Sequence, residues 1–389
     1  MATQTNPTPA VILNLDNFEL VNENRFNKVF DIVNEIGAGG FGIVYKVRNR
    51  MESTPEHDIH YAVKVIRFNQ LTEDNRDISQ LLNEVHINAR MSTHKNIVNY
   101  KTSWIEYCSQ QELENWKNGL DINTCKERHE SGDEPMDTDV DAVESSVNDM
   151  LENLLSATVP VITPNPIRVP SSLWGPSLFV QMELCKQSLD NYLNQRNDKI
   201  EGRLPDKSLM KFGLKIIRDV TNGIRFLHRK RIAHKDITRN NILFGFDKMF
   251  KIADLGYSSL RGSSDENDNS NIGSLSGSGR SFNRRPPEWI PTSDGRGEDL
   301  WDLGILMLDV FYKFNAITDR NEAYVYRSNL YDKRLVPNDL QELYPNIARL
   351  MIWLTELHQK DRPISAAYVL RECLPKLLNS ELCIGLKTT

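Results

Sequence analysis

The amino-acid sequence predicts an α+β protein made of two regions of different class, and two patterns carry that prediction. Before about residue 185, short apolar runs alternate with turn residues, which is typical of β-strands. After that point, apolar residues recur at three- and four-residue spacing, which is typical of amphipathic helices. A chain of 389 residues with 39% apolar and 26% charged residues can bury a sizeable core. We expect a lead-in over residues 1–29, a small lobe over 30–185, a large lobe over 186–378 and a tail over 379–389.

Five strands and one helix are expected in the first region. Asp31–Val47 alternates as strand, glycine turn and strand, and Tyr61–Phe68 follows after a polar loop. Thr102–Tyr107 and Ser177–Leu184 complete the strands, and Asn75–Met91 has the apolar spacing of an amphipathic helix.

Helices dominate the second region. Ser208–Arg229 places its apolar residues on one broad face, and Leu300–Phe314 is apolar nearly all round, as expected of a buried helix. Gln341–His358 and Ile364–Asn379 are also predicted to be helical.

The charge of the chain is uneven. Residues 109–160 contain 13 acidic and 3 basic residues, so the rest of the chain must carry +4 to reach the total of −6. Such a segment, extended by a proline-rich end to about residue 170, predicts a disordered insertion. No stripe of Lys and Arg stands out elsewhere, so no direct nucleic-acid partner is expected.

The sequence also favours a cytoplasmic protein with no membrane partner. No apolar run approaches the roughly 20 residues of a membrane span, and the best one, Leu303–Phe311, contains Asp309. The first residues lack the basic and apolar parts of a signal peptide. The 5 cysteines are scattered without a C-x-x-C pair, as expected of reduced thiols.

Two motifs in the first region indicate phosphate binding. Gly37, Gly39 and Gly42 fit G-x-G-x-x-G, which lets bare backbone approach a phosphate. A dinucleotide-binding fold uses the same spacing, but there the glycines open a helix, whereas here a strand follows. Lys64 lies on the next strand and Glu84 in the following helix, and together they could present an ammonium group to two phosphate oxygens.

Two further motifs follow the long helix. His234 to Asn241 fits H-x-D-x-x-x-x-N, in which the carboxylate of Asp236 can accept a hydroxyl proton and the amide oxygen of Asn241 can bind Mg²⁺. Asp254, in Asp-Leu-Gly after a short strand, could bridge metal and phosphates.

In this order and spacing, the motifs resemble those of the eukaryotic protein kinases over about residues 30–378, apart from the acidic segment. Three further signatures support the resemblance: Pro287-Glu288, Asp299-Leu-Trp-Asp-Leu-Gly304 and Asp361-Arg362-Pro363. It implies the bilobal protein kinase fold, in which the small lobe has an antiparallel sheet plus one main helix and the large lobe is mainly helical.

The resemblance implies ATP and Mg²⁺ as cofactors and a role for each motif residue. Lys64 would bind the α- and β-phosphates with Glu84 positioning it, Asp236 would be the catalytic base, and Asn241 and Asp254 would bind the metal. The residues expected to bind nucleotide are Gly37, Gly39, Gly42, Val44, Lys64, Glu183 and Cys185.

The same resemblance assigns structural roles. Asp299 would hold the catalytic loop, and Glu288, at the end of an activation segment that starts at Asp254, would pair with Arg362. Ser281 stands near the place of the family's activation-segment threonine. Apart from the resemblance, the serine-rich stretch 258–281 leaves two interpretations open: a switch that phosphorylation would order, and a flexible loop with incidental serines.

A narrower resemblance connects the chain with the kinases of eukaryotic initiation factor 2 alpha. It rests on Ser177-Leu-Phe-Val-Gln-Met-Glu-Leu-Cys, on His94-Lys-Asn-Ile-Val-Asn-Tyr, and on the position of the acidic insertion. It implies phosphorylation of a serine of that factor, which lowers translation under stress. The helix that docks substrate in this family would lie within residues 317–329, where Tyr324 and Tyr326 are expected to be exposed.

Several positions depart from the family pattern. Lys235 stands where the family has arginine, Leu255 replaces a phenylalanine, and Thr238 replaces a lysine that touches the transferred phosphate, so Arg239 would have to substitute for that cation. The family dimerises through a reciprocal Arg–Asp pair. Arg25 matches the arginine, but Val29 occupies the place of the acid and Asp31 comes two residues too late, so weaker self-association is expected.

Three functions remain open at this point. The chain could be a serine/threonine kinase acting on initiation factor 2 alpha, or an active kinase with another protein substrate, such as a cell-cycle inhibitory kinase. The third function is that of a pseudokinase or decoy that binds nucleotide or a partner without turnover.

Overall fold

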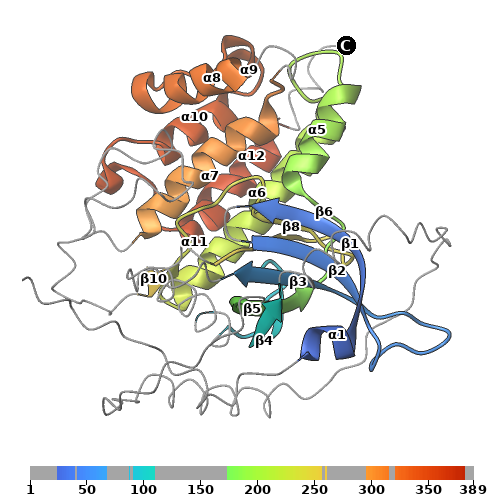
Figure 1. The fold of residues 1–389 in the computed structure, drawn as a ribbon. Coiled ribbons are helices and arrows are strands. Elements are labelled where there is room, and N and C mark those ends of the chain that lie inside the picture. The colour runs from blue at the N-terminus through green and yellow to red at the C-terminus, as the bar shows by residue number, and fades with distance from the viewer. Residues whose placement is uncertain are drawn as a thin grey trace, which may run out of the picture. The chain divides into compact units, whose positions relative to one another are not determined.

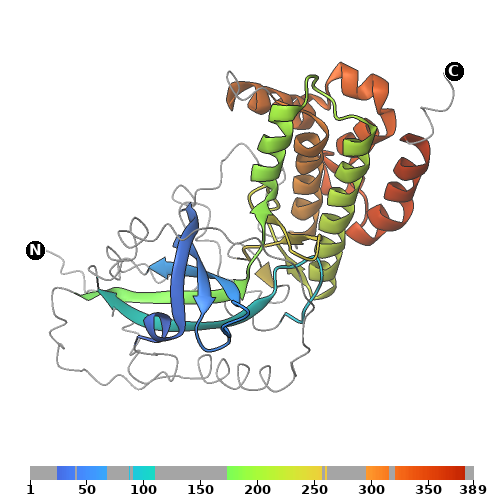
Figure 2. The same ribbon diagram turned by 90° about the vertical axis from the view of Figure 1, so that its right-hand side faces the viewer.

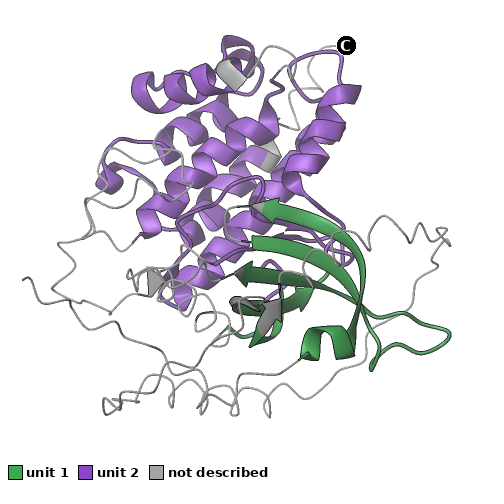
Figure 3. Ribbon diagram, in the orientation of Figure 1, with its two compact units in different colours: residues 1–92, 99–184 green, residues 93–98, 185–389 purple. Residues whose placement is uncertain are grey.

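The computed structural model describes residues 24–39, 42–67, 87, 91–109, 173–255, 259–260, 295–314 and 320–381. The chain divides into two compact units (Figure 3). Unit 1 comprises residues 1–92 and 99–184, and unit 2 comprises residues 93–98 and 185–389. The chain therefore enters unit 2 briefly and returns to unit 1 before it finally leaves at Leu184.

Unit 1 is built on an antiparallel sheet of five strands in the order β1-β2-β3-β5-β4 (Figure 1). The strands are β1 (Phe30–Gly39), β2 (Gly42–Asn49), β3 (His60–Arg67), β4 (Tyr100–Ser109) and β5 (Leu173–Glu183). All five predicted strands are present. Strand β5 pairs with both β3 and β4, so the last strand in the sequence lies inside the sheet and β4 lies at its edge.

Aromatic side chains form the core of unit 1. Trp104 of β4 stacks on Phe179 of β5 with ring centroids 5.3 Å apart. The short helix α1 (Arg25–Val29) adds Phe26, which is 1% exposed and lies 5.1 Å from the ring of Phe179. The Glu106 carboxylate accepts hydrogen bonds from the Phe26 backbone N–H at 2.8 Å and from Trp104 Nε1 at 2.6 Å. Residues 25–29, expected in a lead-in, therefore pack into unit 1.

The predicted helix 75–91 and the acidic insertion fall largely outside the described residues. Of the helix, Ile87 is described as helical and fully buried, and Met91 as a non-helical residue. The insertion is described only at Ser109, which is still part of β4.

Unit 2 is organised around α6 (Lys207–Arg229), which runs beside α7 (Arg296–Phe311) in both views (Figures 1 and 2). The Asp206 carboxylate caps α6 by accepting the Leu209 N–H at 2.8 Å. Helix α7 is buried along almost its whole length, as its apolar sequence predicts. Helix α5 (Leu189–Lys199) precedes α6.

Two small sheets in unit 2 position the loops that carry the motifs. One consists of β6 (Gln187–Ser188), β8 (Ile242–Phe244) and β9 (Phe250–Ile252), and the other of β7 (Ile232–Ala233) and β10 (Ser259–Leu260). Strand β9 also forms a parallel bridge with Ile97, which explains why residues 93–98 belong to unit 2.

The other α-helices within the described ranges are α8 (Arg320–Lys333), α9 (Asn338–Leu343), α10 (Pro345–Leu354), α11 (Ala366–Tyr368) and α12 (Leu374–Glu381). The prediction of a single helix over 341–358 is wrong. Two helices stand there because Pro345, at the first position of α10, cannot donate the backbone hydrogen bond that a continuous helix needs. The helix predicted over 364–379 is α11, a π-helical turn at Val369–Cys373, and α12. No helix among the described residues has the length and apolar character of a membrane span.

Phe26→Ala tests whether α1 is part of the folded unit. Removing a fully buried phenylalanine should lower the free energy of unfolding by about 3–5 kcal/mol, and denaturant unfolding monitored by tryptophan fluorescence would measure it. Lys28→Ala, an exposed position on the same helix, is the control. Equal stability of the two variants would contradict the packing of Phe26.

Candidate active site

In unit 1, the predicted phosphate-binding residues line up across the sheet. Strand register places Gly37 opposite Val44, Val44 opposite Lys64, and Lys64 opposite Val180. Residues directly opposite each other in antiparallel strands present their side chains on the same face. Val44, Lys64 and Val180 therefore form one row of side chains, with bare glycine backbone at its end.

The next row adds a residue that the sequence analysis missed. Ala62 lies opposite Met182 and shares a face with Lys64, because side chains alternate along a strand. Ala62 is 5% exposed and Lys64 is 7% exposed. The alternation in Tyr61-Ala-Val-Lys64 already contained this information, since it puts alanine and lysine on one side.

The glycine turn has a steric requirement at Gly42. Its φ of +122° is a backbone conformation that residues other than glycine rarely adopt. A Cβ built there would lie 2.2 Å from the Val65 carbonyl oxygen. Gly39 pairs with Gly42 across the turn. Only glycine fits where β2 approaches β3 so closely.

The end of β5, which carries Glu183, is fixed by Asn99. The Glu183 N–H donates to the Asn99 carbonyl at 2.9 Å, and the Glu183 carboxylate accepts the Asn99 N–H at 2.6 Å. Cys185, which follows in unit 2, is half-buried.

In unit 2, the carboxylate of Asp299 holds the loop that carries the His234–Asn241 motif. It is completely buried on α7 and accepts the backbone N–H of His234 at 3.0 Å and of Lys235 at 2.7 Å. His228 Nε2 lies 2.7 Å from the same carboxylate. Asp302, one turn further along α7, accepts the Ile237 N–H at 3.1 Å. The first turns of α7 thus bind three backbone donors of the loop, as expected for Asp299.

These donors also keep Asp299 ionised. Burial opposes ionisation, but the hydrogen bond from His228 and the nearby His234 and Lys235 groups outweigh that cost, so the pKa of Asp299 lies below its ordinary value. The stability contributed by this charge is complete above the carboxyl's unfolded-state pKa. It is lost as the pH falls through the lower folded-state pKa.

The backbone at the start of the loop takes an uncommon conformation. Lys235 has a φ of +64°, and the α7 N-cap residue Gly295 has a φ of +71°. A Cβ on Gly295 would lie 2.7 Å from both Ala233 Cβ and Lys235 Cε. Glycine is therefore required where α7 approaches the loop, and the strain at Lys235 persists because Asp299 binds its N–H.

Asp236 and Asn241 form a connected pair within the loop. Asn241 Nδ2 donates to the Asp236 carbonyl at 2.9 Å and to Asp236 Oδ2 at 2.8 Å. The Asn241 carbonyl accepts the Ala253 N–H at 2.8 Å. The loop is thereby joined to the backbone directly before Asp254, whose own φ is +63°.

The ring of His234 contacts the backbone next to this pair on both sides. Its Nε2 lies 3.0 Å from the Ala253 carbonyl, which can only accept, so Nε2 carries a proton. Its Nδ1 is 3.2 Å from the Asp236 N–H and is therefore the acceptor. This fully buried side chain connects Asp236 with the segment before Asp254.

These residues fit a magnesium ion. Asn241 uses its amide nitrogen as the donor to Asp236, which leaves the amide oxygen as the type of ligand that Mg²⁺ prefers. The described residues contain no group of three or more His, Cys, Asp or Glu arranged to hold a metal. Mg²⁺ needs fewer protein ligands, because phosphates and water complete its shell.

Arg239 does not take the place of the missing lysine in this structure. Its guanidinium lies 2.5 Å from the Asp190 carboxylate of α5, and its carbonyl accepts the Asp190 N–H at 3.0 Å. The Thr238 carbonyl accepts the Asn241 N–H at 3.0 Å, which is a backbone role that any residue type can fill.

Three predicted site residues, Glu84, Ser281 and Glu288, lie outside the described residues. The Glu288–Arg362 pair therefore stays a prediction. Arg362 is 3% exposed and donates to the carbonyl oxygens of Gly297 at 3.0 Å, Glu356 at 2.8 Å and Leu357 at 3.2 Å.

Comparison with known proteins decides the family. A model of the protein kinase domain matches residues 30–131 and 171–373, which is more than half of the chain. The chain belongs to the protein kinase family. The kinase thus has the expected bilobal fold, and the family uses ATP and a divalent metal.

Among the curated proteins that this kinase resembles, two of the following three are named as kinases of eukaryotic initiation factor 2 alpha. It is 23% identical to eukaryotic translation initiation factor 2-alpha kinase 1 of Mus musculus, over 94% of this chain and 70% of the relative. It is 25% identical to eIF-2-alpha kinase GCN2 of Arabidopsis thaliana, over 92% and 26%. It is 24% identical to the interferon-induced, double-stranded RNA-activated protein kinase of Rattus norvegicus, over 82% and 48%. The chain spans less than half of the last two proteins.

Asp299→Asn should destabilise this kinase. The amide presents an N–H group toward backbone N–H donors, so at least one buried donor loses its partner at a cost of about 1–3 kcal/mol. The thermal unfolding midpoint should fall, and Asp332→Asn on the exposed face of α8 is the matched control. An unchanged midpoint for Asp299→Asn would show that the loop does not depend on this charge.

Proposed function

We propose that this protein is a serine/threonine kinase that transfers the γ-phosphate of ATP to a serine of eukaryotic initiation factor 2 alpha. It would lower translation initiation under stress, in the cytoplasm. The observation that carries the proposal is the catalytic loop of unit 2. Its Asp236 is oriented by Asn241, and its backbone is bound by Asp299.

Except for Cys185, the residues expected to bind nucleotide belong to unit 1. The bare backbone at Gly37, Gly39 and Gly42 would accommodate phosphate oxygens, and Lys64, next to Val44 in the same row, would neutralise them. Ala62 and the backbone of Glu183 and Cys185 would meet the base. Bound Mg-ATP supplies the activated γ-phosphate and neutralises part of its charge.

Asp236 acts on the acceptor side. Its carboxylate accepts the proton of the substrate hydroxyl, and the hydrogen bond from Asn241 Nδ2 keeps one of its oxygens in a fixed direction. Asn241 would hold the metal through its amide oxygen and Asp254 through its carboxylate.

The substrate is inferred from the relatives, since those from mouse and Arabidopsis are named for initiation factor 2 alpha. The helix expected to dock it is α8, where Tyr324 is 47% exposed and Val325 is 50% exposed. Tyr326, also expected to be exposed, packs instead on Tyr312 with ring centroids 5.3 Å apart. The docking face therefore includes Tyr324 and not Tyr326.

A pseudokinase is the second candidate, and one observation favours it. Thr238 stands where a lysine would meet the transferred phosphate, and the nearby Arg239 is bound to Asp190. A cation at that place stabilises the transition state. Its absence would slow transfer while leaving nucleotide binding intact. An active kinase with a different protein substrate is the third candidate.

Asp236→Asn separates these candidates when transfer of labelled γ-phosphate to purified initiation factor 2 alpha is measured. Loss of the base should lower transfer by about 10²–10⁴-fold, while ATP affinity stays unchanged. Asp198→Asn, an exposed position on α5, is the control and should transfer normally.

Each alternative result has a clear meaning. Transfer only to a generic basic protein would indicate a different substrate. No transfer by the unmodified protein, with ATP still bound, would make it a pseudokinase.

Self-association of the kind used by the family should be weak. Asp31 is engaged within its own chain, because its carboxylate accepts hydrogen bonds from Arg48 and Arg50, both at 2.7 Å. These bonds, that from Arg50 most of all, hold the pKa of Asp31 below its ordinary value. Arg25 lies over the Trp104 ring at 4.4 Å. We expect a monomer in sedimentation at micromolar concentration, unchanged by Arg25→Glu or by Lys28→Glu as control. A tight dimer that Arg25→Glu abolishes would overturn this.

A further inference from the structure

The outward side of α6 carries a single row of cationic side chains. Lys211 and Arg229 are separated by about five helical turns, so they leave the helix in the same direction, about 27 Å apart. Lys215, Arg218 and Arg225 lie between them, within about 40° of that direction. These five residues are called the basic face of α6. They are scattered among apolar residues in the sequence, so the row exists only once the helix has formed.

The charge of the basic face is largely uncompensated. Helix α6 contains one acidic residue, Asp219, which is 1% exposed and forms an ion pair with Lys215 at 2.5 Å. Within the described ranges, the other four cations form no ion pair; three of them are exposed and Arg225 is half-buried. Like charges one helical turn apart repel each other. The face therefore costs helix stability, and a bound polyanion would offset that cost.

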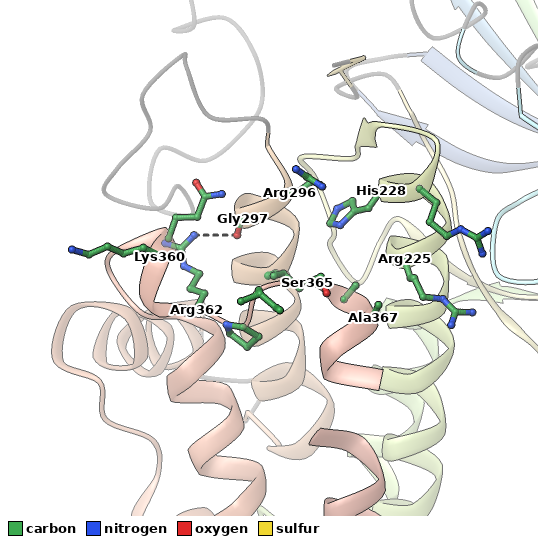
Figure 4. Close-up of a pocket in the computed structure, with 14 residues that line it drawn as sticks. Arg225, His228, Arg296, Gly297, Lys360, Arg362, Ser365 and Ala367 are labelled. Atoms are coloured by element: carbon green, nitrogen blue, oxygen red, sulfur yellow. Dashed lines mark hydrogen bonds between the residues drawn. The ribbon is translucent and has the colours of Figure 1, made fainter. Parts of the chain in front are cut away.

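The direction of Arg225 separates the basic face from a neighbouring pocket. Arg225 borders a pocket between α6, the start of α7 and the loop before α11, yet its side chain points away from α7, to the outer side of α6 (Figure 4). Lys360, from that loop, points to the opposite side (Figure 4). Arg225 therefore belongs to the row on α6, and Lys360 does not.

Two neighbouring segments of unit 2 add positive charge beside the row. Lys215 Nζ donates to the Lys248 carbonyl at 2.9 Å, so the exposed Lys248 lies next to it. The ring of His94 stacks on an aromatic ring of α6, with centroids 4.4 Å apart, and the exposed Lys95 follows His94 in the chain. Burial and the nearby charges of Lys95 and Arg225 lower the pKa of His94, so both cations lie close to its ring.

A small hollow opens beside one end of the row. Its volume is about 140 Å³, close to that of a cavity that holds one benzene molecule. It is lined by Lys211, Leu214, Lys215, Arg218 and Leu374. Each of the two leucines is 3% exposed, and together they supply apolar surface among the cations. A polyanion bound to the row can therefore place one aliphatic group here.

The shape of the basic face favours a polypeptide over other polyanions. A nucleic-acid duplex presents phosphates on both sides of a groove, whereas the face is one row. A single strand needs aromatic rings to stack its bases, and the Phe226 ring is already stacked on His94. A membrane surface needs exposed apolar side chains, and α6, which is described over its whole length, exposes no large one. An extended peptide is one chain wide, and about eight of its residues span that length.

We propose that the basic face of α6 docks an extended acidic segment of a partner protein, with one aliphatic side chain of that segment in the hollow beside Leu374. The chain as a whole carries a charge of −6, so an acidic segment is repelled by much of the protein and attracted to this row. The face contains none of the residues that the proposed kinase reaction uses, so docking is a separate property of unit 2.

Fluorescence anisotropy of a labelled peptide with the full chain tests the proposal. The peptide has about eight residues, alternates glutamate with serine and carries a central leucine. It should bind, whereas its glutamine form should not. Lys211→Gln with Arg218→Gln should weaken binding of the acidic peptide about three- to tenfold, because each exposed ion pair contributes little alone. Replacing the peptide's leucine by serine should weaken binding about tenfold, since the hollow then loses its aliphatic group.

Lys333→Gln with Arg349→Gln is the matched control. It also removes one lysine and one arginine, from exposed positions of α8 and α10 outside the basic face, and should leave binding unchanged. Thermal unfolding midpoints would confirm that both double variants are folded. They should be, because Lys211 and Arg218 are exposed and form no ion pair within the described part of the chain.

Four results would overturn the proposal. Equal affinity for the acidic and glutamine peptides would exclude recognition of charge. Equal loss in the two double variants would indicate attraction without a site. An RNA duplex that binds more tightly than the peptide, and loses that affinity in Lys211→Gln with Arg218→Gln, would assign the face to nucleic acid. Peptide binding that appears only after deletion of residues 110–160 would make the chain's own acidic segment the occupant. Because no phosphate transfer is measured, none of these results bears on the proposed kinase activity.

Discussion

The buried carboxylate of Asp299 is the constraint on which the candidate active-site loop of unit 2 depends. An ionised group without solvent is costly unless donors surround it, and here the donors are the backbone of His234 and Lys235 together with the ring of His228. The relation is mutual, because the carboxylate needs these donors and the loop needs the carboxylate to keep Lys235 in its positive-φ conformation. The direction of Asp236, the next residue, follows from that backbone.

This dependence explains why one departure from the family pattern is tolerable. Asp299 binds the backbone N–H of Lys235 and not its side chain, so lysine in place of arginine leaves that contact unchanged. Thr238 is different, because the family uses the side chain at that position. The nearest cation in the sequence, Arg239, is committed to Asp190 on α5. Any loss of activity should therefore originate at Thr238 and affect transfer, not the folding of the loop.

The start of α7 serves more than one structural purpose. Its carboxylates bind the backbone of the loop that follows β7, and the Gly297 carbonyl accepts a hydrogen bond from the Arg362 guanidinium. One helix end thus holds both the loop and Arg362 in place.

The sequence by itself determined the strands, the principal helices and the order of the catalytic motifs, because periodicity and short motifs are local properties of a chain. It also contained the break at Pro345, which is a local signal that the apolar spacing obscured. Only the tertiary structure decided which partners those residues meet. The N–H of Phe26 reaches Glu106, and the N–H of His234 reaches Asp299, across 80 and 65 residues of sequence. Burial and hydrogen-bond geometry select such pairs, and neither quantity exists until the chain has folded.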